Sequence, residues 1–176
     1  MAELTLETLV HPPFENDPPV KLNISAKIIG LVAAILAGLG VLVYLVSIPV
    51  VLAIGSVVTV AGIATGTHSG ILLVALLGLV VGLIADLLTL VGGWRMYQEN
   101  REGKKLVIYG LVIGLLGNLV YEVGVVSFGG FIFTALIDFV IYYIVVISRF
   151  PGDPPLVTGT MPPPLPPPPP PGPPSA

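Results

Sequence analysis

Long apolar tracts, interrupted by short charged or proline-containing stretches, dominate the sequence. Between residues 28 and 93 the only Asp, Glu, Lys or Arg residue is Asp86, and between residues 106 and 148 there are only Glu122 and Asp138. An α-helix rises about 1.5 Å per residue, so crossing about 30 Å of hydrocarbon takes roughly 20 apolar residues. The pattern therefore predicts several membrane-spanning helices, and we expect an all-α integral membrane bundle.

The ends of the apolar tracts predict four crossings. Pro49 is expected to end the first, because proline lacks a backbone donor and clashes with the preceding helical turn. The crossings are expected at about residues 28–48, 71–93, 105–123 and 130–148, within a transmembrane bundle of residues 24–149. The remaining segments are a polar N-terminal segment (residues 1–23), a charged hinge (residues 94–105) and a proline-rich tail (residues 150–176).

Residues 49–70 raise the question of a fifth crossing, because they are apolar and just long enough to span. The distribution of basic residues decides it, since Lys and Arg gather on the cytoplasmic side. With four crossings, all seven basic residues lie on the same side of the membrane. With five crossings, Lys21 and Lys27 would lie on the opposite side from the other five. We therefore expect residues 49–70 to be an external interfacial or re-entrant segment, partly helical, and both termini to be cytoplasmic.

Composition excludes several classes of function. Of the 176 residues, 55% are hydrophobic and 10% are charged, which suits lipid rather than water as the surrounding solvent. The absence of cysteine excludes thiolate metal sites and disulfides, and a net charge of −3 argues against nucleic acid as a partner. His11 and His68 lie far apart without companion ligands, so no metal or cofactor is expected, and no catalytic constellation is visible.

The tail is the second distinctive part of the sequence. Its run of prolines excludes helix and sheet and predicts a polyproline II rod of about 3.1 Å per residue. Such a rod either binds an aromatic-lined groove in a partner that recognises proline-rich motifs, or serves as a solvated spacer.

Small residues recur at every fourth position on all four predicted crossings, which places them on one helix face. Small residues let membrane helices approach closely, so these faces are predicted to pack against one another. The predicted packing residues are Gly30, Ala34, Gly38, Gly78, Gly82, Gly110, Gly114 and Gly130.

On three of the crossings the same face also carries polar residues. Counting the helix rise from the cytoplasmic boundary places Asp86 about 12 Å, Asp138 about 16 Å and Asn118 about 20 Å into the membrane. We therefore predict an intramembrane polar cluster of these three residues, with Thr134 and Tyr142 as hydrogen-bond neighbours.

The two aspartates of this cluster have no basic partner within the membrane. Two ionised carboxylates close together in a low dielectric are very unfavourable. Either they are protonated and donate hydrogen bonds between helices, or they hold a cation or pass a proton, or they pair with a cation that a partner protein supplies.

The hinge combines aromatic and basic residues. Gly92-Gly93-Trp94-Arg95-Met96-Tyr97, followed by Gly103-Lys104-Lys105-Leu106, resembles the central hinge of small, uncharacterised four-helix prokaryotic membrane proteins. The resemblance covers residues 71–117. It implies four crossings and a cytoplasmic hinge, and it implies no activity.

Aromatic and basic residues near the cytoplasmic boundary are expected to anchor the bundle at the lipid head groups. These predicted interface anchors are Trp94, Arg95, Tyr97, Lys104, Lys105 and Arg149.

These features predict a non-enzymatic multi-pass protein of the cell membrane. Its partners would be the lipid bilayer and either other membrane subunits, to which it is an accessory or structural subunit, or further copies of itself in a homo-oligomeric scaffold. The alternative is a small ion- or proton-conducting transporter that uses Asp86 and Asp138.

Overall fold

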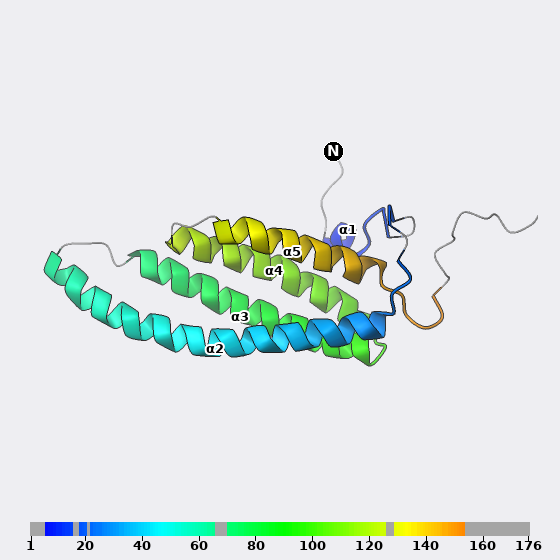
Figure 1. The fold of residues 1–176 in the computed structure, drawn as a ribbon, viewed down its shortest axis with the longest axis horizontal. Helices are drawn as coiled ribbons and strands as arrows, with labels where there is room; N and C mark the ends of the chain where they lie inside the picture. Colours follow the sequence, from blue (N-terminus) through cyan, green and yellow to red (C-terminus); the bar gives the residue numbers. More distant parts are fainter. Residues whose placement is uncertain (1–5, 16–17, 21, 66–69, 126–128, 154–176) are drawn as a thin grey trace, which may run out of the picture.

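The computed structural model describes residues 6–15, 18–20, 22–65, 70–125 and 129–153. The chain is mostly helical. A short helix, α1 (Leu6–Val10), precedes four long ones, α2 (Ala26–Thr65), α3 (Gly70–Tyr97), α4 (Glu102–Val125) and α5 (Gly129–Ile147) (Figure 1). The predicted polyproline rod, Lys21 and His68 lie outside the described residues.

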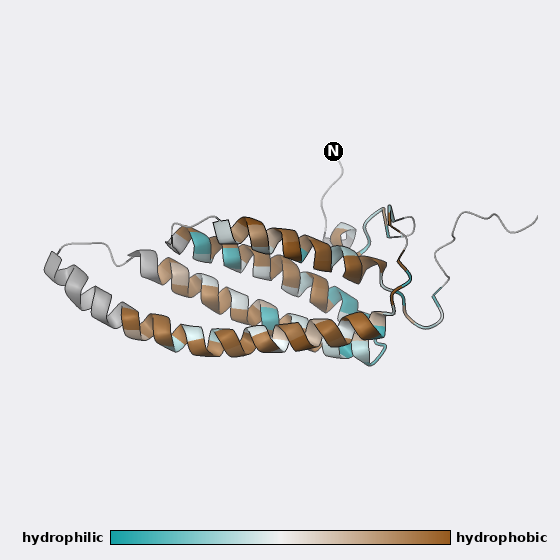
Figure 2. Ribbon diagram, viewed as in Figure 1, coloured by the Kyte–Doolittle hydropathy of each residue, from teal (hydrophilic) through white to brown (hydrophobic). Residues whose placement is uncertain are grey.

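Four helices in the described part of the chain are long and apolar enough to cross a membrane. The candidate spans are Ala26–Ile54, Leu73–Tyr97, Glu102–Val123 and Gly129–Ile147. Figure 2 shows hydrophobic residues along the length of these helices and hydrophilic ones concentrated at the turn between α3 and α4 and in the segment before α2. The prediction of an all-α protein with four membrane-length helices is confirmed.

The prediction that Pro49 ends the first crossing is wrong. Helix α2 continues through Pro49 to Thr65, a length of 40 residues. Proline removes one backbone hydrogen bond, but ending the helix among apolar residues would leave several backbone groups without partners. Residues 50–65 are therefore helical and continuous with the first crossing, and their position relative to the membrane stays a prediction.

The four long helices alternate in direction, as Figure 1 shows. The start of α2, the turn between α3 and α4 and the end of α5 therefore meet at one end of the bundle. Two backbone hydrogen bonds pin this end together, because Ala26 N donates to Arg149 O (2.8 Å) and Arg149 N donates to Ile24 O (3.0 Å). We call it the basic end, because it gathers the described Lys and Arg residues, which are Lys27, Arg95, Arg101, Lys104, Lys105 and Arg149.

Helix α3 is the centre of the bundle. It packs most extensively against α4 and next against α2, whereas α5 packs mainly against α4 and scarcely touches α2. At the basic end a hydrophobic cluster joins α1 to the long helices, and its buried members are Val10, Ala26, Met96, Val107, Ile108, Val145, Val146 and Phe150.

Glycines set the distance between α3 and its two neighbours. A Cβ atom added to Gly30 on α2 would lie 2.7 Å from Gly93 O on α3, and one added to Gly78 on α3 would lie 2.5 Å from Tyr121 N on α4. Real Cβ atoms do not approach other atoms so closely, so the backbones are in direct contact at both places. Gly38 and Gly114 have more room, with nearest atoms at 3.7 and 3.5 Å.

The substitution Gly78→Ala tests this packing. Because the new Cβ would overlap Tyr121, α3 and α4 must separate, and we expect a loss of about 1–3 kcal/mol in the free energy of unfolding. The measurement is the melting temperature of the purified protein in detergent.

Gly38→Ala is the matched control, since it makes the same change on α2, where Leu90 Cδ1 lies 3.7 Å away. Alanine favours helix over glycine by about 1 kcal/mol, so this variant should melt at the same or a higher temperature. Equal melting temperatures for the two variants would contradict the close contact of α3 with α4.

Candidate functional site

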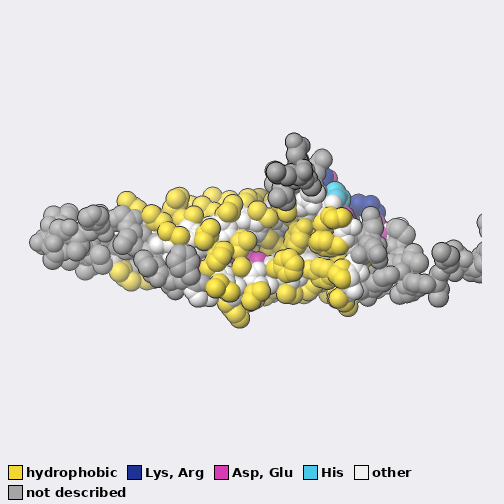
Figure 3. All heavy atoms as spheres, turned by 90° about the horizontal axis from the view of Figure 1, so that it is seen from above, with side chains coloured by type: hydrophobic (Ala, Val, Ile, Leu, Met, Phe, Trp, Pro, Cys, Tyr) yellow, Lys and Arg dark blue, Asp and Glu magenta, His cyan; other side chains and the backbone are white. Residues whose placement is uncertain are grey.

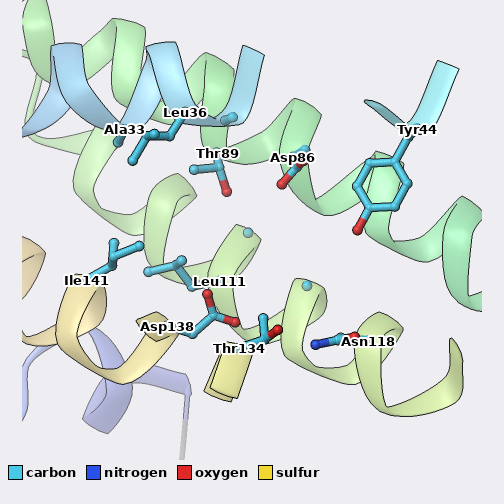
Figure 4. A pocket seen from close by; sticks show the side chains of 13 residues that line it. Ala33, Leu36, Tyr44, Asp86, Thr89, Leu111, Asn118, Thr134, Asp138 and Ile141 are labelled. Carbon is cyan, nitrogen blue, oxygen red and sulfur yellow. The ribbon is translucent and has the colours of Figure 1, made fainter. Parts of the chain in front are cut away.

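A cavity of about 300 Å³ lies among the four long helices. The space exists because several lining residues of α2 and α4 are Ala or Gly. Polar side chains from all four helices point into it (Figure 4). We call it the polar cavity. Its lining is Ala33, Leu36, Ala37, Tyr44, Asp86, Thr89, Gly110, Leu111, Gly114, Asn118, Thr134, Asp138 and Ile141.

Four residues of the predicted polar cluster line this cavity. Asp86 comes from α3, Asn118 from α4, and Thr134 and Asp138 from α5, and Figure 4 shows them around one space. The helical spacing and the estimated depths are enough to place them together, because the antiparallel helices start from a common basic end.

Tyr142, predicted as a hydrogen-bond neighbour of the cluster, lines a second, apolar pocket that it shares with Asp138. Its hydroxyl donates a hydrogen bond to Leu9 O at 2.7 Å, and its side chain is not part of the cavity lining. The reason is that α1 folds back against the basic end and offers a carbonyl there. No periodic pattern in the sequence shows this contact.

Tyr44 is a cavity residue that the sequence analysis missed. Its hydroxyl lies against Gly82 of α3, where a Cβ atom would overlap it, and the Asp86 carboxylate lies in the same way against Gly40 of α2. Glycines on each helix therefore make room for a polar side chain from the other. One feature of the sequence could have indicated a special role for Tyr44, which is the only aromatic residue between residues 28 and 48.

The acids of the cavity have no partner within the described chain. Thr89 and Thr134 donate their hydroxyls to carbonyls of their own helices, Ala85 O and Gly130 O, both at 3.0 Å. No described residue makes a hydrogen bond or ion pair with Asp86 or Asp138, and the lining contains no Lys, Arg or His. The cavity thus presents two carboxyl groups and a carboxamide without a cation.

The bundle is open on the side where α2 and α5 face each other. The contacts between α2 and α3, α3 and α4, and α4 and α5 close the other sides, but α2 and α5 scarcely touch. We call this side the α2–α5 seam. Leu36, which lines the cavity, is also 53% exposed. Figure 3 shows an acidic side chain at the surface in the middle of an otherwise hydrophobic region.

Glu122 is a further acid within a candidate membrane span and lies outside the cavity lining. It is 8% exposed, its Oε2 atom has no hydrogen-bond partner, and its other carboxylate oxygen lies against Gly130 of α5. Gly130, predicted as a packing residue, therefore makes room for this carboxylate and not for the backbone of another helix.

The predicted interface anchors divide into two groups. Trp94 and Arg95 are exposed, Trp94 packs against Tyr97 with ring centroids 5.6 Å apart, and Lys27 Nζ lies 5.4 Å from the centroid of the Tyr97 ring. Lys105 is partly exposed and pairs with Glu102 at 3.2 Å. These residues lie at the surface of the basic end, and their role as head-group anchors stays a prediction.

Lys104 and Arg149 are placed differently. The Lys104 ammonium is buried and donates to Glu15 Oε1 (2.6 Å) and Val146 O (2.7 Å), so its prediction as a lipid contact is wrong. Arg149 is partly buried and donates to Glu15 O at 3.0 Å. The cause is the N-terminal segment, which folds onto the basic end and supplies Glu15 as a partner of both residues.

Glu15 holds this segment in place. It accepts from Lys104, its Oε2 lies 2.9 Å from His11 Nδ1, and the neighbouring Phe14 ring stacks on Tyr143 at 5.8 Å. Burial alone would raise the pKa of Glu15, but the hydrogen bonds and charges of Lys104 and His11 outweigh it and hold the pKa below its usual value of 4.5.

Comparisons of the chain with protein-family models, with curated proteins and with solved structures find no match. Within the described ranges, no three His, Asp or Glu side chains come together as a metal site would require.

Replacing Glu15 by Gln should loosen the basic end. The change leaves the buried Lys104 ammonium without its counter-charge, and we expect it to lower the free energy of unfolding by about 1–3 kcal/mol near pH 7. The matched control is Glu99→Gln, whose pair with Lys27 is exposed and is worth at most about 1 kcal/mol. Melting temperatures in detergent measure both effects.

The pH dependence of this effect has a definite sign. Because folding lowers the pKa of Glu15, its contribution is present above pH 4.5 and is lost as the pH falls through the folded-state pKa. The difference in melting temperature between the wild type and Glu15→Gln should therefore shrink on going from about pH 7 to about pH 3. A constant difference over that range would show that the Glu15 charge does not stabilise the basic end.

Proposed function

We propose that this protein is a non-enzymatic, multi-pass membrane protein that acts as an accessory or structural subunit of a larger membrane assembly. The observation that carries the proposal is the open α2–α5 seam beside two unpaired acids. Unpaired polar groups facing hydrocarbon are costly, so a bundle that worked alone would be expected to close over them. A partner chain packed on the seam removes that cost.

The side chains of the cavity support a binding role over a catalytic one. The hydroxyls of Thr89 and Thr134 are held by carbonyls of their own helices, so neither is set up as a nucleophile beside a base. The close glycine contacts of α3 with α2 and α4 also suit a rigid structural element.

The orientation that we propose places the basic end in the cytoplasm, following the bias of Lys and Arg to that side. The chain contains no cysteine, so single cysteines report the topology without background. Gln98 is exposed in the turn between α3 and α4, and Gly129 at the start of α5 has no atom within 4 Å of an added Cβ.

In intact cells, a membrane-impermeant maleimide should label Gly129→Cys and spare Gln98→Cys. After permeabilisation it should label both. The reverse pattern in intact cells would contradict the orientation, and labelling of both without permeabilisation would contradict a membrane crossing by α4.

The subunit role is tested by the mass and composition of the native assembly after gentle extraction from its own membrane. We expect other membrane chains in fixed stoichiometry with this one. A homo-oligomer would reduce the role to that of a scaffold built from one chain, and a monomer would contradict a subunit role.

A small transporter is the second candidate, because two carboxyl groups and the Asn118 carboxamide share one cavity. The double substitution Asp86→Asn with Asp138→Asn separates the two candidates, since the amides keep the shape and hydrogen bonding but cannot release a proton. For a subunit, the purified wild type and the double variant should give the same background proton and cation flux in liposomes. A wild-type flux that the double variant abolishes would establish transport instead.

A further inference from the structure

The acids of the polar cavity have no cationic partner among the residues that line it. Residues 28–93 and 106–148 contain no Lys or Arg, so neither this bundle nor a second copy of it can bring such a side chain to the depth of Asp86 and Asp138. Asp86 lies eleven residues before the end of α3 and Asp138 nine before the end of α5, which places both about 15 Å from the basic end. That depth is near the middle of the hydrocarbon.

Hydrophobic side chains lie on the side of the polar cavity that faces the basic end. Leu111 and Ile141 line the cavity there, together with Thr89. Beyond them Met96, Ile108 and Val145 are fully buried in the hydrophobic cluster. A hydrated ion arriving from this end would have to shed its water among hydrocarbon side chains, which is unfavourable. The seam, by contrast, opens sideways between α2 and α5.

The surface around the seam suits a helix. Large apolar side chains are exposed along both flanking helices, among them Val43 on α2 and Val140 on α5. An apolar helix that lies along them replaces lipid contacts with packing contacts and brings one side chain into the cavity.

We propose that the partner packed on the α2–α5 seam is a transmembrane helix with one Lys or Arg near the middle of its span, and that this cation lies between Asp86 and Asp138. The proposal rests on the subunit role proposed above and gives the chemistry of the partner. An ammonium group has three donors and no acceptor, which matches a cavity that offers two carboxyl groups, the Asn118 carbonyl oxygen and the Tyr44 hydroxyl oxygen. Each charge offsets the cost of the other in hydrocarbon.

Synthetic transmembrane peptides test the charge directly. The full-length protein, labelled with a donor dye, is reconstituted in phosphatidylcholine vesicles with acceptor-labelled Leu/Ala-rich peptides of about 21 residues. One peptide carries a single central Lys and the other carries Leu at that position, and oriented circular dichroism establishes that both span. Energy transfer should show the Lys peptide binding about tenfold or more tightly than the Leu peptide.

Two variants assign the preference to the cavity. Asp86→Asn with Asp138→Asn should remove the preference for the Lys peptide while the helix content stays unchanged. Glu122→Gln, which removes a buried acid outside the cavity lining, should retain it. Both variants keep a hydrogen-bonding side chain of similar shape, so both are expected to fold. A loss of peptide binding then reports the loss of the carboxylates and not a loss of folding.

The proposal is overturned if the wild type binds the two peptides equally, or if the preference persists in the double Asn variant. Self-association that excludes both peptides would assign the seam to a second copy and would also overturn it. Failure here differs from failure of the subunit role. A native complex with other chains but no Lys preference would reject the charge pairing alone, whereas a native monomer would reject the subunit role.

Discussion

In hydrocarbon a helix gains little by burying apolar side chains against another helix, because the lipid tails are equally apolar. The bundle therefore depends on how closely its backbones approach, and glycine sets that distance. Gly30 and Gly93 bring α2 against one face of α3, and Gly78 brings the other face against α4 at Tyr121. No Cβ atom fits at those points, so the backbones of α2, α3 and α4 lie in direct contact there.

The polar cavity follows from the same constraint. Helix α5 contacts chiefly α4 and scarcely touches α2. Within the space that remains, glycines make room for polar groups, as Gly40 does for Asp86 and Gly82 for Tyr44. Small residues therefore have two roles in this protein, backbone contact between α2, α3 and α4 and space for the cavity side chains.

How much the sequence predicts depends on whether a feature is periodic. The four membrane-length helices follow from hydropathy, and the grouping of Asp86, Asn118, Thr134 and Asp138 follows from helical spacing and depth. The prediction that Pro49 ends a helix was wrong because it used a rule for helices in water. In water the backbone groups freed by a broken helix find other hydrogen-bond partners. The contacts of Lys104 and Tyr142 escaped prediction because they are made with Glu15 and Leu9 of a short N-terminal segment that has no repeating pattern.

The distribution of ion pairs gives the strongest reason to look outside this chain for a partner. At the basic end, next to water, Lys27, Arg101, Lys104 and Lys105 all have acidic partners within the chain, and the exposed pairs among them add little to stability. In the middle of the bundle, where a charge is most costly, the two cavity acids have none among the described residues. Among the described residues, charges are thus paired where the gain is small and left unpaired where the cost is large. The missing favourable interaction must be protonation, a bound cation or a partner helix, and only a helix also covers the open side between α2 and α5.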